Sequence, residues 1–130
     1  MINSKWTVLG ASVPGKNHIE NNIPCQDHHT IVFLDESTGI ACLADGAGSC
    51  SNSHIGSELT ISFAIEQFLS MYNDYPVKDI LLNSWPELAA ESVFVVHERL
   101  KAYSISEEIE FHSLSSTLIV LLFSPINFFL

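Results

Sequence analysis

Two aspartates in the first third of the chain have the surroundings that a metal site requires. Asp45 follows the short apolar run Ile40–Leu43 and is followed at once by a glycine-rich turn that begins at Gly46. A strand fixes the carboxylate, and glycines let backbone carbonyls approach a bound ion closely. Asp27 lies upstream, at the start of another apolar segment. Carboxylate and carbonyl oxygens are the ligands that hard cations such as Mg²⁺ and Mn²⁺ prefer.

The residue pattern around these aspartates predicts a β-hairpin. Thr30–Leu34 and Ile40–Ala44 are apolar and partly β-branched, and the polar stretch Asp35–Gly39 between them is typical of a turn. Asp27 would stand where the first strand begins, and Asp45 where the second strand ends. Because these two ends are neighbours in an antiparallel pair, both carboxylates can face one site.

Other segments predict further strands and a loop. Trp6–Val13 is apolar and β-branched before a Pro-Gly turn, so we expect a strand there. The polar segment Lys16–Pro24 is predicted as a loop. Ser116–Phe123 has apolar residues on both faces, which is typical of a strand in the interior of a sheet. The apolar stretch Leu114–Leu130 is interrupted by polar residues and proline, and it falls short of the ~20 apolar residues of a membrane-spanning helix.

Two long helices are expected between these strands. Ser51 or Ser53 would cap a helix that runs to about Tyr72. A second helical region begins near Asp79 and is interrupted at Pro86, which is best tolerated in the first turn of a new helix. The second helix carries an apolar stripe at helical spacing that we expect in the core: Trp85, Ala89, Val93, Val96, Leu100 and Tyr103.

The predicted element order is strand, strand, strand, helix, helix, strand, which is an α+β fold. The last strand has the composition of one with neighbours on both edges, and we expect no later segment to supply the second neighbour. The sequence therefore predicts the first half of a larger α+β domain.

Composition limits the classes of partner. The chain has 130 residues, of which 47% are hydrophobic and 15% charged, so a single folded domain is expected. Its formal net charge of -10 would repel nucleic acids and anionic membranes. The first residues, Met1–Trp6, lack a signal-peptide core. Three cysteines without paired spacing indicate reduced thiols, and hence a cytoplasmic protein: Cys25, Cys42 and Cys50.

Several short motifs, in order along the chain, together resemble the PPM-type (protein phosphatase 2C-like) family, in particular its compact bacterial branch. The matching residues span nearly the whole chain: Trp6, Gly10-Ala11-Ser12-Val13, His18, Pro24-Cys25-Gln26-Asp27, Ala44-Asp45-Gly46-Ala47-Gly48-Ser49, Gly56 and Ser116-Thr117-Leu118. The resemblance implies the N-terminal half of a PPM-type β-sandwich flanked by helices.

The resemblance also implies an activity, the hydrolysis of phosphoserine or phosphothreonine in a phosphoprotein substrate. The cofactors would be two Mg²⁺ or Mn²⁺ ions, bridged by a water that becomes hydroxide at neutral pH and attacks phosphorus. Asp45 matches the aspartate that bridges both metals, and Gly46 the residue whose carbonyl binds one of them. Asp27 matches an outer ligand that acts through water, and Gln26 stands where many members have Glu. His18 could act near the phosphate, because Asn22 occupies the position of the family's phosphate-binding arginine.

The family's later metal-binding motifs, a Gly-Asp-Gly turn and a C-terminal Asp-Asn, have no counterpart in this sequence. We therefore expect residues 1–130 to form a partial PPM-type domain with weak metal binding and little turnover on its own. The alternative is a non-catalytic remnant that acts as a partner-binding module. The oligomeric state is not predicted.

The same residues also allow simpler interpretations. Asp45-Gly46 alone could be an ordinary turn, and Asp27 could merely begin a strand. The glycine-rich turn before a helix could hold a phosphate through backbone N–H groups, although it lacks the lysine of a P-loop. Cys25 beside His28 and His29 could form a nucleophilic pair, but adjacent histidines at a strand start are more often surface residues.

Overall fold

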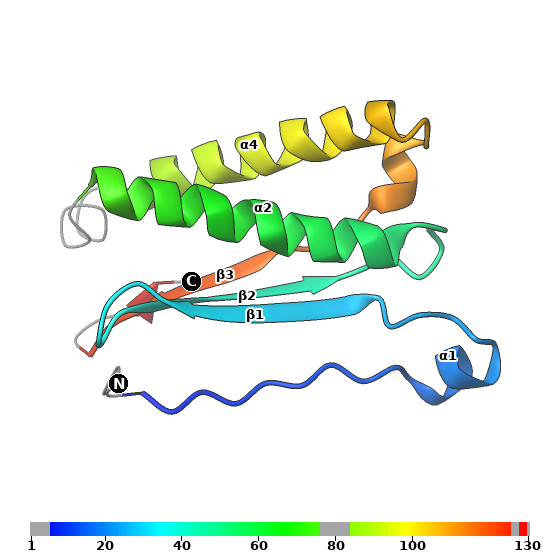
Figure 1. Cartoon of the computed structure of the whole chain (residues 1–130), viewed down its shortest axis with the longest axis horizontal. Helices are drawn as coiled ribbons and strands as arrows, with labels where there is room; N and C mark the ends of the chain where they lie inside the picture. Colours follow the sequence, from blue (N-terminus) through cyan, green and yellow to red (C-terminus); the bar gives the residue numbers. More distant parts are fainter. Residues whose placement is uncertain (1–5, 76–83, 126–127, 130) are drawn as a thin grey trace.

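The computed structural model describes residues 6–75, 84–125 and 128–129, and it confirms an α+β fold. Two long helices lie together over one face of an antiparallel sheet, and the extended N-terminal segment runs along the opposite face (Figure 1). The elements in chain order are α1 (Lys16–Glu20), β1 (Asp27–Phe33), β2 (Gly39–Asp45), α2 (Ser53–Asp74), α4 (Trp85–Ser106), the 3₁₀ helix η1 (Phe111–Leu114), β3 (Ile119–Phe123) and β4 (Phe128–Phe129).

The sheet has the order β1-β2-β3-β4, and every pair in it is antiparallel. The predicted hairpin is confirmed: β1 and β2 pair with Asp27 directly opposite Asp45. The expectation that no later segment would pair with the last strand was wrong. β4 pairs with the end of β3, where Leu122 and Phe123 lie opposite Phe129 and Phe128.

The turn between β1 and β2 is organised by one carboxylate. Asp35 Oδ1 accepts hydrogen bonds from the backbone N–H groups of Ser37 and Thr38, both at 2.7 Å. Its Oδ2 accepts the hydroxyl of Tyr72 from α2 at 2.9 Å. Although partial burial alone would raise the pKa of Asp35, these hydrogen bonds to the ionised form outweigh it and lower the pKa. The turn thereby fixes the register of the hairpin and ties it to α2.

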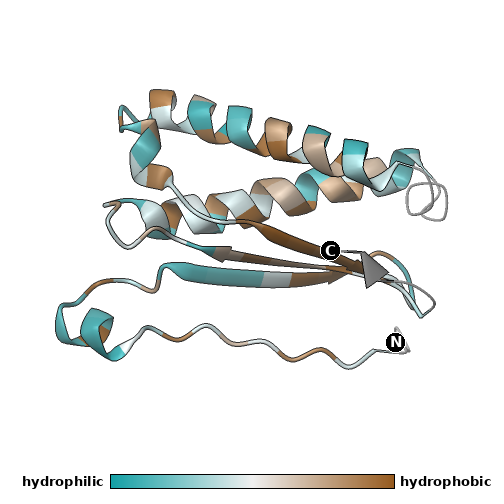
Figure 2. Ribbon diagram, turned by 180° about the vertical axis from the view of Figure 1, so that it is seen from behind, coloured by the Kyte–Doolittle hydropathy of each residue, from teal (hydrophilic) through white to brown (hydrophobic). Residues whose placement is uncertain are grey.

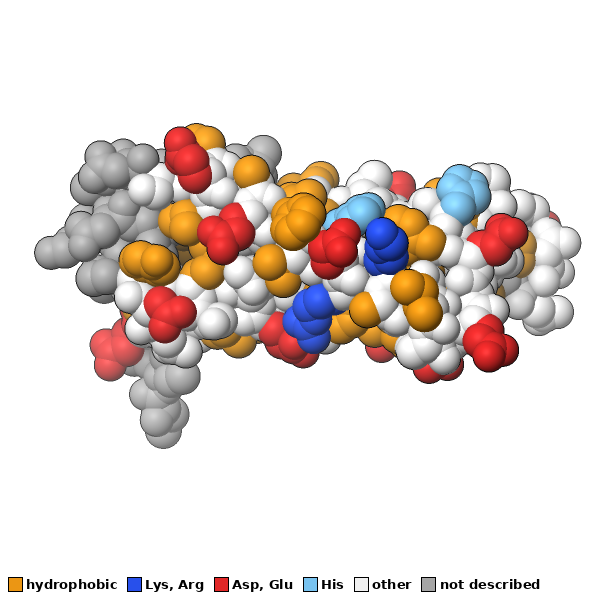
Figure 3. All heavy atoms as spheres, turned by 90° about the horizontal axis from the view of Figure 1, so that it is seen from above, with side chains coloured by type: hydrophobic (Ala, Val, Ile, Leu, Met, Phe, Trp, Pro, Cys, Tyr) orange, Lys and Arg blue, Asp and Glu red, His pale blue; other side chains and the backbone are white. Residues whose placement is uncertain are grey.

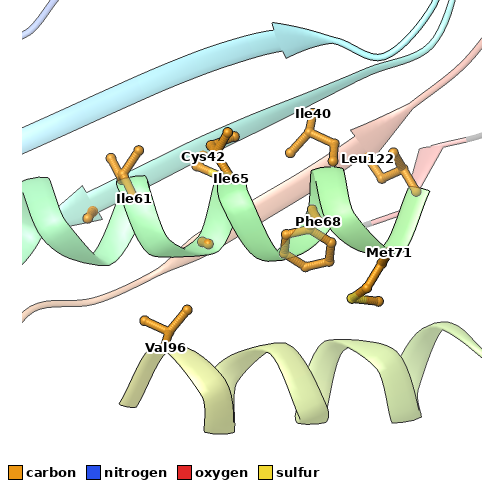
Figure 4. Close-up of a cluster of buried hydrophobic side chains, with 10 residues drawn as sticks. Ile40, Cys42, Ile61, Ile65, Phe68, Met71, Val96 and Leu122 are labelled. Atoms are coloured by element: carbon orange, nitrogen blue, oxygen red, sulfur yellow. The ribbon is translucent and has the colours of Figure 1, made fainter. Parts of the chain in front are cut away.

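The core lies between the sheet and the helices. Alternate residues of β2 face α2 and are buried, among them Ile40 and Cys42 at 2% and 0% exposure. Figure 4 shows these side chains meeting residues of α2, with Val96 approaching from α4. Each fully buried aliphatic or aromatic side chain contributes roughly 1.5–3 kcal/mol. The buried cluster consists of Ile40, Cys42, Ala44, Ile61, Ala64, Ile65, Phe68, Met71, Val96 and Leu122.

The start of α2 differs from the prediction that Ser51 or Ser53 caps it. Asn52 is the N-cap residue, and Ser53 is the first residue of the helix. The hydroxyl of Ser53 is buried and accepts a hydrogen bond from Gln26, so it is not used for capping. The expected placement of Pro86 in the first turn of a new helix is confirmed in α4. The predicted helical start near Asp79 lies outside the described residues.

An ion pair and a cation–π contact join helices α2 and α4. Arg99 pairs with Glu66 at 2.7 Å, and its guanidinium lies 3.9 Å from the ring centre of Phe63. The expected apolar stripe of α4 is only partly in the core, because Val93 is 57% exposed. On the outer face of the helical layer, hydrophobic side chains alternate with acidic ones (Figure 3).

The prediction of a strand at Trp6–Val13 was wrong: the segment is extended, but it is not part of the described sheet. Side chains hold it against the sheet instead. Trp6 Nε1 donates to the carbonyl of Ser37 at 2.9 Å, and the Ser12 hydroxyl lies 2.7 Å from His29 Nδ1. Figure 2 shows this segment running alongside the sheet without joining it as a strand, and the short α1 follows it inside the predicted loop. No described helix is long and apolar enough to cross a membrane.

We expect Asp35→Ala to lower the free energy of unfolding by about 1 kcal/mol at pH 7, because the turn loses its charge-assisted hydrogen bonds. The folded-state pKa of Asp35 is below its ordinary value, so its contribution is present above pH 4 and is lost as pH falls through the folded pKa. Urea unfolding at pH 7 and near pH 2.5 measures this. Glu36→Ala, at the exposed neighbouring acid, is the control; an equal loss in both variants contradicts the assignment.

Candidate metal centre

The two predicted aspartates lie side by side at one end of the β1–β2 pair. The Gly46 N–H donates to the Gln26 carbonyl at 3.0 Å, immediately beside the Asp27–Asp45 pair. Asp27 and Asp45 therefore occupy a position of the ladder that exchanges no hydrogen bonds, where opposite Cα atoms are about 4.5 Å apart. Ala44, which directly precedes Asp45, is buried in the core against α2, so the side chain of Asp45 points to the opposite face of the sheet. Asp27 lies directly opposite Asp45, and its side chain therefore shares that face. Sequence and register thus bring both carboxylates together.

Asp45 is held from its other side by Thr117. The Asp45 N–H donates to Thr117 Oγ1 at 3.0 Å, and the Thr117 N–H donates to the Asp45 carbonyl at 2.8 Å. The next residues of the turn are paired as well, because Gly46 forms a bridge with Ser116 and Ala47 N–H donates to the Ser115 carbonyl. The backbone of Asp45 is consequently fixed between two neighbouring chain segments.

The two carboxylates interact unfavourably when both are ionised. The pKa of Asp27 is raised by partial desolvation and by the hydrogen bond and negative charge of Asp45. The charges of His18 and His28 oppose this rise and lower the pKa. Both aspartates are exposed to solvent, so a proton or a cation from solution can reach them. A divalent cation between two such carboxylates would relieve the repulsion between their negative charges.

The other predicted site residues occupy distinct places around this pair. Gly46 is buried, and a Cβ atom there would lie 2.7 Å from the Ser53 carbonyl oxygen. Gln26 is also buried; its Nε2 donates to Ser53 Oγ at 2.9 Å, so its amide is used on the α2 side of the sheet. His18 is half-buried in α1, near enough for its charge to lower the pKa of Asp27.

A nucleophilic cysteine–histidine pair does not form at Cys25. Its thiol donates to the backbone carbonyl of Asp27, at 3.5 Å. His28 Nδ1 lies 2.8 Å from the Ser57 hydroxyl, and His29 Nδ1 lies 2.7 Å from that of Ser12. The two histidines point to opposite faces of the sheet, as alternation along a strand requires.

Two residues that support the aspartate pair through hydrogen bonds, Thr117 and Ser57, are not predicted as site residues from the sequence. In the sequence, Thr117 belongs to a family motif that gives it no role, and Ser57 lies in a predicted helix with no signal of its own. Alternation along β1 could have shown that His28 faces α2, but its partner on α2 depends on how helix and sheet are aligned. That alignment is a tertiary property.

The carboxylates lie in a cleft on the open face of the sheet. The cleft has a volume of about 670 Å³, and its walls include the segment from Val8 to Val13 and the outer faces of β1 and β2. Leu43 and Ile119 form part of its apolar floor. The site is thus open to ligands from the side opposite the helices.

The available donors match a hard cation in type but are too few in number. Two carboxylates and the Gly46 carbonyl are oxygen ligands of the kind that Mg²⁺ and Mn²⁺ prefer. Within the described part of the chain, no group of three or more His, Cys, Asp or Glu side chains could hold a metal ion together. The described residues alone therefore do not make up a complete site for such a cation.

Comparison with known proteins identifies the class. The sequence model of the protein phosphatase 2C family matches residues 14–130, so the chain belongs to this family. It is 29% identical over 124 residues to the serine/threonine-protein phosphatase 3 of Escherichia coli (strain K12), a match that covers 92% of this chain and 47% of that protein. The chain thus spans about half the length of this curated relative. No solved structure matches the chain significantly.

The family resemblance seen in the motifs is thereby confirmed. The chain is a member of the protein phosphatase 2C family, with the α+β architecture expected for an N-terminal part of such a domain.

Gly46→Ala should destabilise the protein by about 1–3 kcal/mol, because the new Cβ meets two backbone carbonyls and the turn after Asp45 must move. These are the carbonyls of Ser53 and Gln26, at 2.7 and 2.9 Å. Gly48→Ala is the matched control, since its nearest neighbour would be Gln26 Oε1 at 3.8 Å. Urea unfolding compares the two, and equal stability of both variants would argue against a close approach at Gly46.

Proposed function

We propose that residues 1–130 form part of a metal-dependent protein phosphatase domain that hydrolyses phosphoserine or phosphothreonine in phosphoproteins. The observation that carries the proposal is the register that places Asp27 opposite Asp45 at an open cleft. Membership of the protein phosphatase 2C family and the name of the Escherichia coli relative support the reaction class.

Each site residue receives a role in this proposal. Asp45 would bridge two Mg²⁺ or Mn²⁺ ions, Gly46 would offer its carbonyl to one, and Asp27 would act through water. Two such cations, when bound, lower the pKa of water and offset the charge of a phosphate monoester. His18, which lies in α1, would attract the substrate phosphate when its imidazole is protonated. Gln26 would support the turn after Asp45 from the α2 side of the sheet.

The site needs ligands beyond the described residues. The relative is about twice as long as the match, and further carboxylates would come from a polypeptide corresponding to its other half.

Reduced thiols support a cytoplasmic location, since all three cysteines are free. The acidic surface argues against nucleic acid and anionic membranes as partners.

A partner-binding module without activity is the second candidate. It is favoured by the apolar residues on the open sheet face, where Leu43 and Ile119 are each 49% exposed. A surface of this kind is typical of an interface. Under this alternative, Asp27 and Asp45 would be retained without a metal.

The proposal is tested by calorimetric titration of the chain with Mn²⁺. We expect a dissociation constant tighter than roughly 1 mM for the wild type and loss of binding in Asp45→Asn. Asp27→Asn should weaken binding. Without metal at pH 7, it should leave the melting temperature unchanged or raise it, because the two unfavourable effects that raise the pKa of Asp27, desolvation of its charge and repulsion from Asp45, are removed.

Glu36→Gln is the matched control, since it removes one acidic charge from the turn at the other end of the hairpin. It should bind Mn²⁺ like the wild type. Absence of binding in the wild type, or binding that survives Asp45→Asn, would contradict a metal site at this pair and favour the non-catalytic module.

A further inference from the structure

A buried polar network lies directly behind the aspartate pair, on the α2 side of the sheet. Its centre is the backbone carbonyl of Gln26, which accepts the Gly46 N–H at 3.0 Å and the Ser57 hydroxyl at 2.6 Å. Ser57 is fully buried, and His28 Nδ1 lies 2.8 Å from its oxygen. The network therefore connects β1, the turn after β2 and the first turns of α2.

Counting protons shows the direction of these hydrogen bonds. A serine hydroxyl has one proton, and that of Ser57 faces two carbonyl acceptors, Gln26 at 2.6 Å and His54 at 3.1 Å. It has none left for His28, so the imidazole must donate from Nδ1. The Gln26 carbonyl then has both lone pairs used, one by Ser57 and one by Gly46.

The position of the Asp45 carboxylate depends on this carbonyl. Gly46 directly follows Asp45, and its N–H is held only 3.0 Å from Gln26 O. A second contact restrains the same turn, because Gln26 Nε2 donates to Ser53 Oγ and the Ser53 carbonyl lies beside Gly46. Ser53 and Ser57 are four residues apart on one face of α2, so a single helix face supports the turn at two points.

We propose that His28 and Ser57 are positioning residues for the Asp27–Asp45 pair. His28 donates to Ser57, Ser57 holds the Gln26 carbonyl, and this carbonyl holds Gly46 and with it the end of β2. Both residues act through this chain of hydrogen bonds. The part of this inference that concerns a metal ion rests on the proposed function, whereas the anchoring of Gly46 does not.

The test combines amide hydrogen exchange with Mn²⁺ titration on the full 130-residue chain. His28→Leu removes the donor, and His28→Asn keeps an N–H at the place of Nδ1. In His28→Leu we expect the Gly46 amide to exchange ~10-fold faster, the size of one lost hydrogen bond, and Mn²⁺ affinity to fall by a similar factor. His28→Asn should restore both to within ~3-fold.

Two further variants complete the design. Ser57→Ala should reproduce the effect of His28→Leu at Gly46, while His28→Asn keeps the test valid if the buried Ser57 position does not tolerate change. His29→Leu is the control, because this histidine faces the other side of the sheet and contacts Ser12. It should leave exchange at Gly46 as in the wild type.

The outcomes separate the two claims. Unchanged exchange at Gly46 in His28→Leu, or an equal increase in His28→Leu and His28→Asn, would overturn the positioning role. If Gly46 responds as expected but the wild type binds no Mn²⁺, the anchoring is supported and the proposed metal function fails. If the wild type binds Mn²⁺ and His28→Leu binds it equally well, the proposed function stands and the positioning role is wrong.

Discussion

The arrangement of the candidate site depends on the register between β1 and β2. Side chains alternate along a strand, so a slip of one residue would turn Asp27 toward the helices and bring His28 to the open face. Three features prevent this slip. The Asp35 turn closes one end of the hairpin, and the buried residues of β2 must meet α2. The Gln26 carbonyl fixes the other end at Gly46. The two aspartates are adjacent because of these constraints.

The helix α2 supports the sheet with two different surfaces. Near its middle and end, apolar side chains such as Ile65 and Phe68 pack on the strands. At its start, the buried contacts are those of small polar residues, Ser53 and Ser57. Burying hydroxyls is tolerated because each has a hydrogen-bond partner, whereas an unpaired one would cost about 1–3 kcal/mol. The polar surface lies behind the place where the backbone turns sharply, and backbone groups there need partners other than a strand.

Much of this could be predicted from local sequence. Alternation and turn residues located the hairpin, and the position of Pro86 located the start of α4. The segment Trp6–Val13 has the composition of a strand but forms no ladder among the described residues, because pairing requires a partner strand and propensity does not supply one. The role proposed for His28 could not be predicted either. It arises from an alignment of α2 with β1 that tertiary packing determines.

In the function proposed above, the paired register of Asp27 and Asp45 forms one side of a divalent-cation site. Crystals of the chain soaked in Mn²⁺ and measured at the manganese absorption edge test it directly. We expect an anomalous peak within bonding distance of the Asp45 carboxylate, about 2.0–2.3 Å, with Asp27 facing the same ion directly or through water. Two results would contradict a cation site at this pair: ordered carboxylates with no anomalous peak beside them, or anomalous peaks found only elsewhere on the surface.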